Sequence, residues 1–574
     1  MAENRQDELI RYLTDRYLHS ETWEENRPLG FARYTSENAP YEVLFSPCRV
    51  GQQTLKNRLM IAPEGRCPFA SESDEALKDF YLHRAESGAG LLCSWPYSVE
   101  RDADPGRMIR WSPLNKRLRA LGAKTLLQLI PDSEKPEKWN ESAAAALAGG
   151  FDGICLELRG GFSSSVEAVK TFRRRLGSEA LLLLRVSLSP ALAESGLPVP
   201  KKPALPSLAG SFEALTELWR AGADAFEVSL GCGETPWLRP PSVYLPAACF
   251  GEAARAVHDY FRSKGLPAAV AASGRLGYPD VDELLVRSQS CELISLDGAG
   301  LSDPNWCRKA REGRCAEIDP QPLASFTIRS GREKIAVTGG GCSGMQFALK
   351  AAADGRQVEL FEADAALGGR ARFGVSRAAY ESENRLARLR ALVAGDPSIR
   401  VRPATTANPD LLKKGDPDLL VFAQGLRASA PCIPGWGEIP FVSAEELPFV
   451  RREGRRIAIL GASRAACELA WKLLSEDGAR RVFLVTAEEE IMPDAPDEDR
   501  AWMLHHLPLR GGRILKRCLP KAVSRGTLLV FDEAKRKRRP LPCDLIVVTP
   551  DGPPDDRLLR RCIHERLAPE YDIL

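Results

Sequence analysis

Short apolar runs alternate with longer amphipathic stretches through the chain from Val43 to Leu296. The runs have the length of β-strands, and the stretches between them have the apolar spacing of helices. Eight runs follow this pattern: residues 58–62, 90–93, 125–129, 153–156, 181–186, 225–228, 268–271 and 293–296. Repeated βα units in this number predict a closed (β/α)8 barrel, with an open doubly wound sheet as the alternative.

A different pattern begins at Lys334. Residues 335–338 form an apolar run typical of a buried parallel strand, and Gly339, Gly341 and Gly344 follow in G-x-G-x-x-G spacing. A helical pattern and a second strand come next, and that strand ends in Glu362. The glycines permit a tight turn and close approach of a pyrophosphate to the helix N-terminus, and the acid accepts hydrogen bonds from a ribose. The full context predicts a dinucleotide site.

A weaker copy of this pattern begins with the strand 456–460. In the loop that follows, residues 461–466, two of the three expected glycines are alanine or serine, and the next strand ends without an acid. A Cβ at the second position stands where a phosphate must approach, so a retained scaffold is favoured over bound NAD(P)H, although Arg464 could contact a phosphate. The basic run 535–539 is placed like a hairpin tip, and a solvated turn is its simplest interpretation.

These patterns divide the chain. Residues 1–40 carry Leu9, Leu13 and Tyr17 on one helical face, which indicates a helix that either packs on its own domain or docks on a partner. The expected domains are a helical extension (1–40), a barrel (41–318), a Rossmann-like domain (331–450 with 541–574) and a nested nucleotide-binding domain (451–540). The strand 544–549 is expected to return to the first Rossmann-like sheet.

Composition narrows the class of protein. The 574 residues include 79 basic and 77 acidic side chains, so the formal charge of +2 does not indicate nucleic acid or an anionic membrane as a partner. No apolar run is long enough to span a bilayer and the N-terminus is polar, which predicts a cytoplasmic protein. The 15 cysteines form no C-x-x-C pair and the six histidines have no metal-site spacing, so no metal site is expected.

Several stretches resemble one known family. They are LFSPCRVGQQTLKNRLMIAPEG (44–65), FYLHRAESGAGLL (80–92), FDGICLEL (151–158) and LLRVSLS (183–189). They resemble the Old Yellow Enzyme, or NADH:flavin oxidoreductase, family, in the long branch with 2,4-dienoyl-CoA reductase and trimethylamine dehydrogenase. The resemblance runs from about Leu44 to the C-terminus. It implies an FMN barrel, an iron–sulfur cluster, and an FAD fold with a nested nucleotide-binding domain.

The resemblance also implies positions for FMN. Backbone near the isoalloxazine would come from Ala62, Pro63 and Gly65, a ring contact from Gln128, and a positive charge at flavin N1 from Arg185. The turn that contains Gly274 matches a family phosphate turn. The next phosphate turn departs from the family, because Asp297 and Gly298 stand where it has glycine and arginine. An acid beside a phosphate is unfavourable, so the binding of FMN by the barrel stays an open question.

The catalytic and cluster positions depart further. Phe162 matches the family's proton-donating tyrosine, and phenylalanine has no proton to give. We therefore assign no catalytic residue, with Glu64 or Glu157 as a conceivable substitute acid. Cys315 matches the start of the cluster segment, but no cysteine follows it up to Glu333. Because the other cysteine ligands are missing, we expect no iron–sulfur cluster here, although the family has one.

FAD is the cofactor that the sequence favours. To the glycine loop and Glu362 the resemblance adds Gly369, in the turn after the acid strand, and Gly425, at a strand end near FAD, with Gln424 in place of threonine. The family's final glycine–aspartate pair is not found.

Two functions remain open. One is a flavin-dependent oxidoreductase that lacks the iron–sulfur cluster. The other is a catalytically degenerate auxiliary subunit, with FAD or no cofactor, paired with a second copy or with an active homologue. The substrate is not indicated.

Overall fold

The computed structural model forms two compact units, residues 1–322 and 323–574, and each is described by itself. The structure describes residues 41–63, 75–102, 105–131, 135–158, 162–188, 209–230, 240–245, 247–315, 318, 331, 333–373, 377–426, 431–444, 447, 455–476, 480–493, 495–549 and 555–574. The expected N-terminal helix with Leu9, Leu13 and Tyr17 lies outside these residues, as do Glu64 and Gly65.

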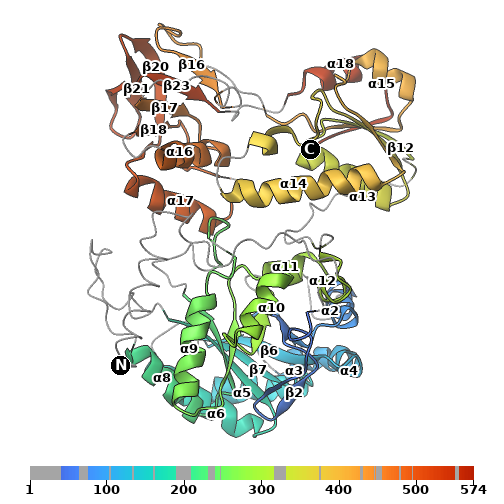
Figure 1. The fold of residues 1–574 in the computed structure, drawn as a ribbon, viewed down its shortest axis with the longest axis vertical. Helices are drawn as coiled ribbons and strands as arrows, with labels where there is room; N and C mark the ends of the chain where they lie inside the picture. The colour runs from blue at the N-terminus through green and yellow to red at the C-terminus, as the bar shows by residue number, and fades with distance from the viewer. Residues whose placement is uncertain are drawn as a thin grey trace. The chain divides into compact units, whose positions relative to one another are not determined.

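Parallel strands close into a barrel in the first unit (Figure 1). Its eight strands among the described residues are β3 (Leu59–Ile61), β4 (Leu91–Cys93), β6 (Lys124–Ile130), β7 (Gly153–Glu157), β8 (Leu181–Ser187), β9 (Ala225–Ser229), β10 (Ala269–Ala272) and β11 (Leu293–Ser295). Pairing of β3 with β11 on one side and with β4 on the other completes the circle. The predicted closed barrel is confirmed, and the open sheet is excluded.

Helices surround these strands, so the strands are buried on both faces and appear in the sequence as continuous apolar runs. The longer described helices are α2 (Glu75–Ser87), α4 (Ser112–Ala120), α5 (Pro136–Ala148), α6 (Phe162–Leu176), α8 (Ala209–Arg220), α9 (Gly251–Ser263) and α10 (Pro279–Arg287). Short helices α11 (Gly298–Ser302) and α12 (Trp306–Arg311) follow the last strand. The hairpin of β1 (Cys48–Val50) and β2 (Gln53–Leu55) precedes the first.

The second unit begins with a parallel sheet of five strands among the described residues. Its order is β14 (Ile399–Arg402), β13 (Gln357–Phe361), β12 (Lys334–Thr338), β15 (Leu419–Phe422) and β24 (Glu570–Ile573). Alternate residues of β12 face opposite ways: Ile335 and Val337 pack with α13 (Cys342–Ala353) and α14 (Arg377–Gly395). Ala336 packs on the other side, with α15 (Pro409–Gly415) and α18 (Arg557–Glu565). This sheet has the predicted Rossmann-like layers.

A second parallel sheet carries the nested nucleotide-binding pattern. Its order is β16 (Phe441–Ser443), β23 (Leu545–Val548), β17 (Arg456–Leu460), β18 (Arg481–Val485) and β19 (Arg513–Leu515), and α16 (Arg464–Glu476) and α17 (Asp497–Leu509) belong to the same region. The antiparallel strands β20 (Cys518–Ser524), β21 (Thr527–Asp532) and β22 (Lys537–Pro542) form a third sheet. A hairpin is found at 535–539, but only Lys535 and Arg536 lie in its turn, whereas Lys537, Arg538 and Arg539 belong to strand β22.

One strand was assigned to the wrong sheet. Residues 544–549 were expected to return to the first sheet, but β23 pairs with β16 and β17 in the second. The edge beside β15 is taken instead by β24, near the C-terminus. An apolar run identifies a buried strand, but it does not say which of two similar sheets buries it.

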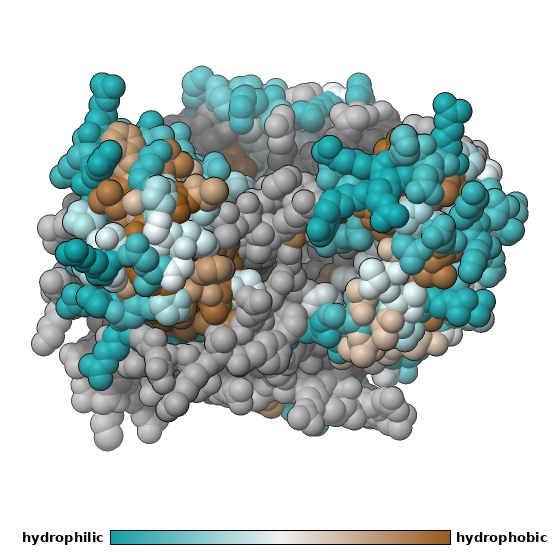
Figure 2. All heavy atoms as spheres, turned by 90° about the horizontal axis from the view of Figure 1, so that it is seen from above, coloured by the Kyte–Doolittle hydropathy of each residue, from teal (hydrophilic) through white to brown (hydrophobic). Residues whose placement is uncertain are grey.

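The surface of the described residues is mixed. Figure 2 shows hydrophilic residues at the outermost projections of one face, with hydrophobic residues between them. The exposed large apolar side chains are scattered along the chain, from Ile109 to Ile573, as is usual for single surface apolar residues. No described helix is long and apolar enough to cross a membrane.

Candidate functional site

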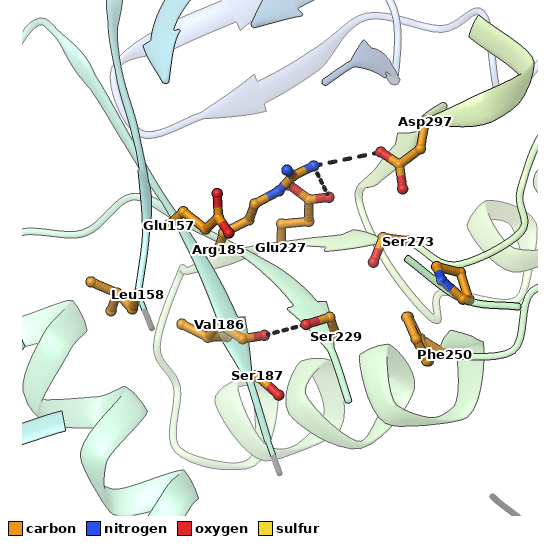
Figure 3. A pocket seen from close by; sticks show the side chains of 11 residues that line it. Glu157, Leu158, Arg185, Val186, Ser187, Glu227, Ser229, Phe250, Ser273 and Asp297 are labelled. Carbon is orange, nitrogen blue, oxygen red and sulfur yellow. Dashed lines mark hydrogen bonds and ion pairs between the residues drawn. The ribbon is translucent and has the colours of Figure 1, made fainter. Parts of the chain in front are cut away.

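Polar side chains gather where the barrel strands end (Figure 3). Glu157 ends β7, Arg185 and Glu227 lie in β8 and β9, and Ser273 and Asp297 follow β10 and β11. The carboxyl ends of parallel barrel strands meet on one face, where barrel enzymes have their active sites. The first unit therefore has its candidate site at this end.

Arg185 is held by carboxylates. Its Nε lies 2.7 Å from Glu227 Oε2 and its Nη2 lies 2.9 Å from Glu227 Oε1, a bidentate pair between side chains that are 7% and 2% exposed. Asp297 Oδ1 is 3.5 Å from the same Nη2, which also donates to the carbonyl of Ala62 at 3.3 Å. The charge expected to face flavin N1 is thus neutralised within the protein.

Glu227 was missed by the sequence analysis. The signal was there, because a carboxylate inside the apolar strand 225–228 must find a partner when it is buried. The register between the two strands places Arg185 of β8 directly opposite Glu227 of β9.

Gln128 is fully buried beside Arg185. The side-chain amide of Gln128 is oriented so that both its nitrogen and its oxygen have hydrogen-bond partners. The nitrogen donates to the carbonyls of Ser94 (3.1 Å) and Pro63 (3.3 Å), and the oxygen accepts from Arg185 Nη1 (3.0 Å). The structure therefore brings Ala62, Pro63, Gln128 and Arg185 together, as the resemblance implies. Their polar groups, however, bond to one another.

The turn at Gly274 is closed by packing. A Cβ there would lie 2.4 Å from the Phe250 ring and 2.9 Å from Cys249 Sγ, so the glycine is required for packing. The amides of Ala248 and Cys249 donate to the carbonyls of Arg275 and Gly274. The side of this turn that faces Phe250 leaves no room for a phosphate.

FMN does not fit the residues described at this end of the barrel. Three carboxylates (Glu157, Glu227, Asp297) against one guanidinium (Arg185) give a formal charge of −2, whereas a flavin phosphate itself carries about two negative charges. The cavity that these groups line holds about 20 Å³. One water needs roughly 10–15 Å³, so this cavity between the described side chains has room for about one water.

The predicted catalytic positions are only partly described. Gly160, Gly161 and the side chain of Phe162 lie outside the described residues. Glu157, one of the two substitute acids considered, lies in the cavity and is 6% exposed (Figure 3).

In the glycine loop before α13, the first and third glycines have the predicted steric roles. Gly339 has φ +107°, and a Cβ there would lie 2.3 Å from the carbonyl oxygen of Ala423. A Cβ on Gly344 would lie 2.0 Å from the carbonyl oxygen of Gly339, so the third glycine lets helix and strand touch. Gly341 precedes the first residue of α13, and a Cβ there would meet nothing within 4 Å. The open space lies where a pyrophosphate is expected.

Glu362 and Gly369 lie at the same loop. Glu362 is 8% exposed, and its two carboxylate oxygens accept from the amides of Gly340 (2.8 Å) and Asp364 (2.9 Å). Each oxygen keeps a second lone pair for a ribose hydroxyl. A Cβ on Gly369 would lie 3.3 Å from Gly341 Cα. These residues fit the adenosine and pyrophosphate part of FAD.

Gly425 lies at the end of β15, and its carbonyl accepts from the amide of Asp555 at 3.1 Å. It lines a small cavity of about 10 Å³ with Gln424 and residues near the C-terminus. The structure leaves its expected contact with FAD untested.

The corresponding loop of the second sheet is bonded to another segment of the chain. The amide of Met492 donates to the carbonyl of Ala462 at 2.6 Å, and these residues are 1% and 4% exposed. Arg464, which was expected to be available for a phosphate, forms a 2.6 Å ion pair with the buried Asp499. The loop does not fit NAD(P)H.

No group of three or more His, Cys, Asp or Glu side chains that could hold a metal occurs in the described part of the chain. Cys315, at the start of the expected cluster segment, is buried with its sulfur 3.1 Å from the hydroxyl of Tyr41. Burial raises the pKa of this thiol above its ordinary value. It is therefore held as a structural thiol.

Comparison with known proteins supports the family. The chain is 22% identical to cinnamate reductase of Clostridium sporogenes (79% of this chain and 84% of the relative covered) and 23% identical to NADH oxidase of Thermoanaerobacter brockii (84% and 89%). No family model matches. The fold is shared with 2-naphthoyl-CoA reductase (TM-score 0.76, 17% identity, 93% and 96% covered) and with histamine dehydrogenase of Rhizobium sp. 4-9 (0.76, 15%, 93% and 94%). These likenesses support an Old Yellow Enzyme-like flavin oxidoreductase family.

Proposed function

We propose that this protein binds FAD at its Gly339 loop and holds no FMN in its barrel, so that the barrel is a scaffold. On this proposal the protein is an auxiliary member of a family of flavin oxidoreductases. The observation that carries it is the Arg185–Glu227 pair with Asp297, which turns the expected flavin-facing cation into part of a closed anionic cluster.

FAD, when bound, supplies a ring that accepts or donates a hydride. The residues of this chain would hold the part of the cofactor that does not react. The amides at the start of α13 and the helix dipole favour the pyrophosphate, Gly341 leaves it room, and Glu362 fixes a ribose.

The test is the identity of the flavin released from the purified protein. We expect about one FAD per chain and no FMN, because the first-sheet loop has the dinucleotide geometry and the barrel cavity does not admit a flavin. Equimolar FMN and FAD would overturn the FMN part of the proposal, and a colourless protein that cannot be reconstituted would overturn the FAD part.

A matched pair of variants locates the FAD. Gly341→Ala puts a methyl group into the open space without a backbone clash, so FAD occupancy should fall while the fold is kept. Gly395→Ala, at a glycine that also has open space around it, is the control and should keep its FAD. Equal occupancy in both variants would mean that the flavin lies elsewhere.

The second candidate is an active flavin-dependent reductase without an iron–sulfur cluster, and the acid Glu157 in the barrel cavity favours it. On this reading, FMN would be recovered and Glu157→Gln would slow reduction of an activated double bond. On the auxiliary reading, the protein pairs with a second copy or with an active homologue. The mass of the protein in solution, alone and mixed with such a homologue, tests that pairing.

A further inference from the structure

Basic side chains meet at the amino end of the second sheet, away from the Gly461 loop at its carboxyl end. Arg456, Arg481 and Arg513 are the first residues of β17, β18 and β19. Lys537, Arg538 and Arg539 come from β22, beyond the hairpin turn. All six line one hollow of about 420 Å³, together with Phe483 and residues 540–542.

Strand register forces the three arginines together. Arg456 is the direct partner of Arg481, and Arg513 is the partner of Phe483, two residues after Arg481. Because side chains alternate along a strand, all three leave the sheet on the same face, and neighbouring strands are only about 4.8 Å apart. Like charges placed directly opposite in a sheet repel and destabilise it. A ligand of opposite charge would relieve this repulsion.

The hollow is only partly neutralised by the protein. Arg456 pairs with Asp544 at 2.6 Å and Arg539 with Asp532 at 3.1 Å. Arg481, Arg513, Lys537 and Arg538 have no acidic partner within the described residues. Six cations less two carboxylates leave a formal charge of +4 on this hollow, in a chain whose total is +2.

We propose that this hollow binds a small compound with several phosphate groups, such as a nucleoside triphosphate or an inorganic polyphosphate. Guanidinium groups bind phosphate oxygens in bidentate fashion, and several of them converge here from separate strands. The volume of about 420 Å³ suits a small ligand. The site does not depend on the proposed FAD function.

The experiment is calorimetric titration of the full-length protein with inorganic tripolyphosphate and, separately, with ATP at low salt. We expect one saturable site per chain and weaker binding as salt is raised, because the contacts are ionic. The double variant Arg481→Gln/Arg513→Gln should bind about tenfold more weakly or worse. Both side chains are exposed, so the variant should keep the thermal midpoint of the native protein.

The control removes the same charge elsewhere. Arg110→Gln/Arg117→Gln changes two exposed arginines of the first unit and should bind tripolyphosphate like the native protein. Tighter binding of ATP than of tripolyphosphate would identify a nucleotide as the ligand, and equal binding would identify the phosphate chain alone. The proposal would be overturned if tripolyphosphate showed no saturable binding, or if the control variant bound it as weakly as the double variant. It would also be overturned if a single-stranded oligonucleotide bound more tightly than tripolyphosphate.

Discussion

At the scale of single residues, the barrel end is governed by pairing of buried charges. The family resemblance predicted which groups would meet: it placed Gln128, Arg185 and Asp297 at one site, and they lie there. The partner of Arg185 could not be predicted, because a strand pattern gives the direction of a side chain but not the register between strands. That register decides whether Arg185 faces a ligand or Glu227.

The Arg185–Glu227 pair gives a stability prediction. Glu227→Ala leaves a buried guanidinium without its main partner, so the free energy of unfolding should fall by about 3–5 kcal/mol. Urea unfolding of the barrel measures it. Glu213→Ala, at an exposed position of α8, is the control and should change stability by no more than about 0.5 kcal/mol. Equal effects would mean that Arg185 finds another partner or water.

His506 gives a pH prediction. Burial lowers the pKa of this imidazole to about 3, and the ring stacks on Trp502 with centroids 4.3 Å apart. The unfolded chain takes up a proton near the ordinary pKa of 6.5, whereas the folded chain does not until about pH 3. Stability contributed by this residue is therefore complete above pH 6.5 and declines as pH falls towards 3, by at most about 1.4 kcal/mol per pH unit.

Thermal midpoints at pH 7.5 and pH 5 test this dependence. The native protein should lose more stability between these values than His506→Phe, which keeps the aromatic stack and has no proton to bind. An identical loss in both proteins would show that the imidazole is not the titrating group.

At the scale of elements, apolar runs predicted all eight barrel strands because these strands are buried on both faces. The glycine loop of β12 and α13 was also predictable, since Gly339 and Gly344 are both required sterically. Two features were not predictable. The strand 544–549 has an apolar run that fits either sheet, and Met492, which bonds to the second loop, lies in a segment without a motif.

The β12–α13 loop gives a prediction at this scale. Gly344→Ala drives a Cβ against the carbonyl oxygen of Gly339, so strand and helix must separate and the second unit should be destabilised by about 1–3 kcal/mol. Gly341→Ala, three residues earlier, meets no atom and should leave stability unchanged while it lowers FAD occupancy. Thermal unfolding with and without added FAD separates the two effects. Equal destabilisation by both variants would contradict this division of tasks.

At the scale of the whole molecule, the chain shares its fold with 2-naphthoyl-CoA reductase and histamine dehydrogenase, but only one of the three nucleotide-cofactor positions that the resemblance implies fits its group. The first-sheet loop is open at Gly341, the barrel cavity is small and anionic, and the loop of the second sheet is bonded to Met492. The fold and the relatives support a family, whereas activity depends on these local sites.

The last prediction concerns the loop 461–466 of the second sheet. If Met492 and the Arg464–Asp499 pair exclude a nicotinamide dinucleotide, NADH or NADPH added without oxygen should leave the bound FAD oxidised, because no hydride donor is held in the protein. Dithionite, a small reductant that needs no binding site, should bleach the same FAD and is the control. The visible spectrum distinguishes these outcomes. Rapid bleaching by NADH would mean that the loop opens to admit the nucleotide, and the active-reductase reading would then replace the auxiliary one.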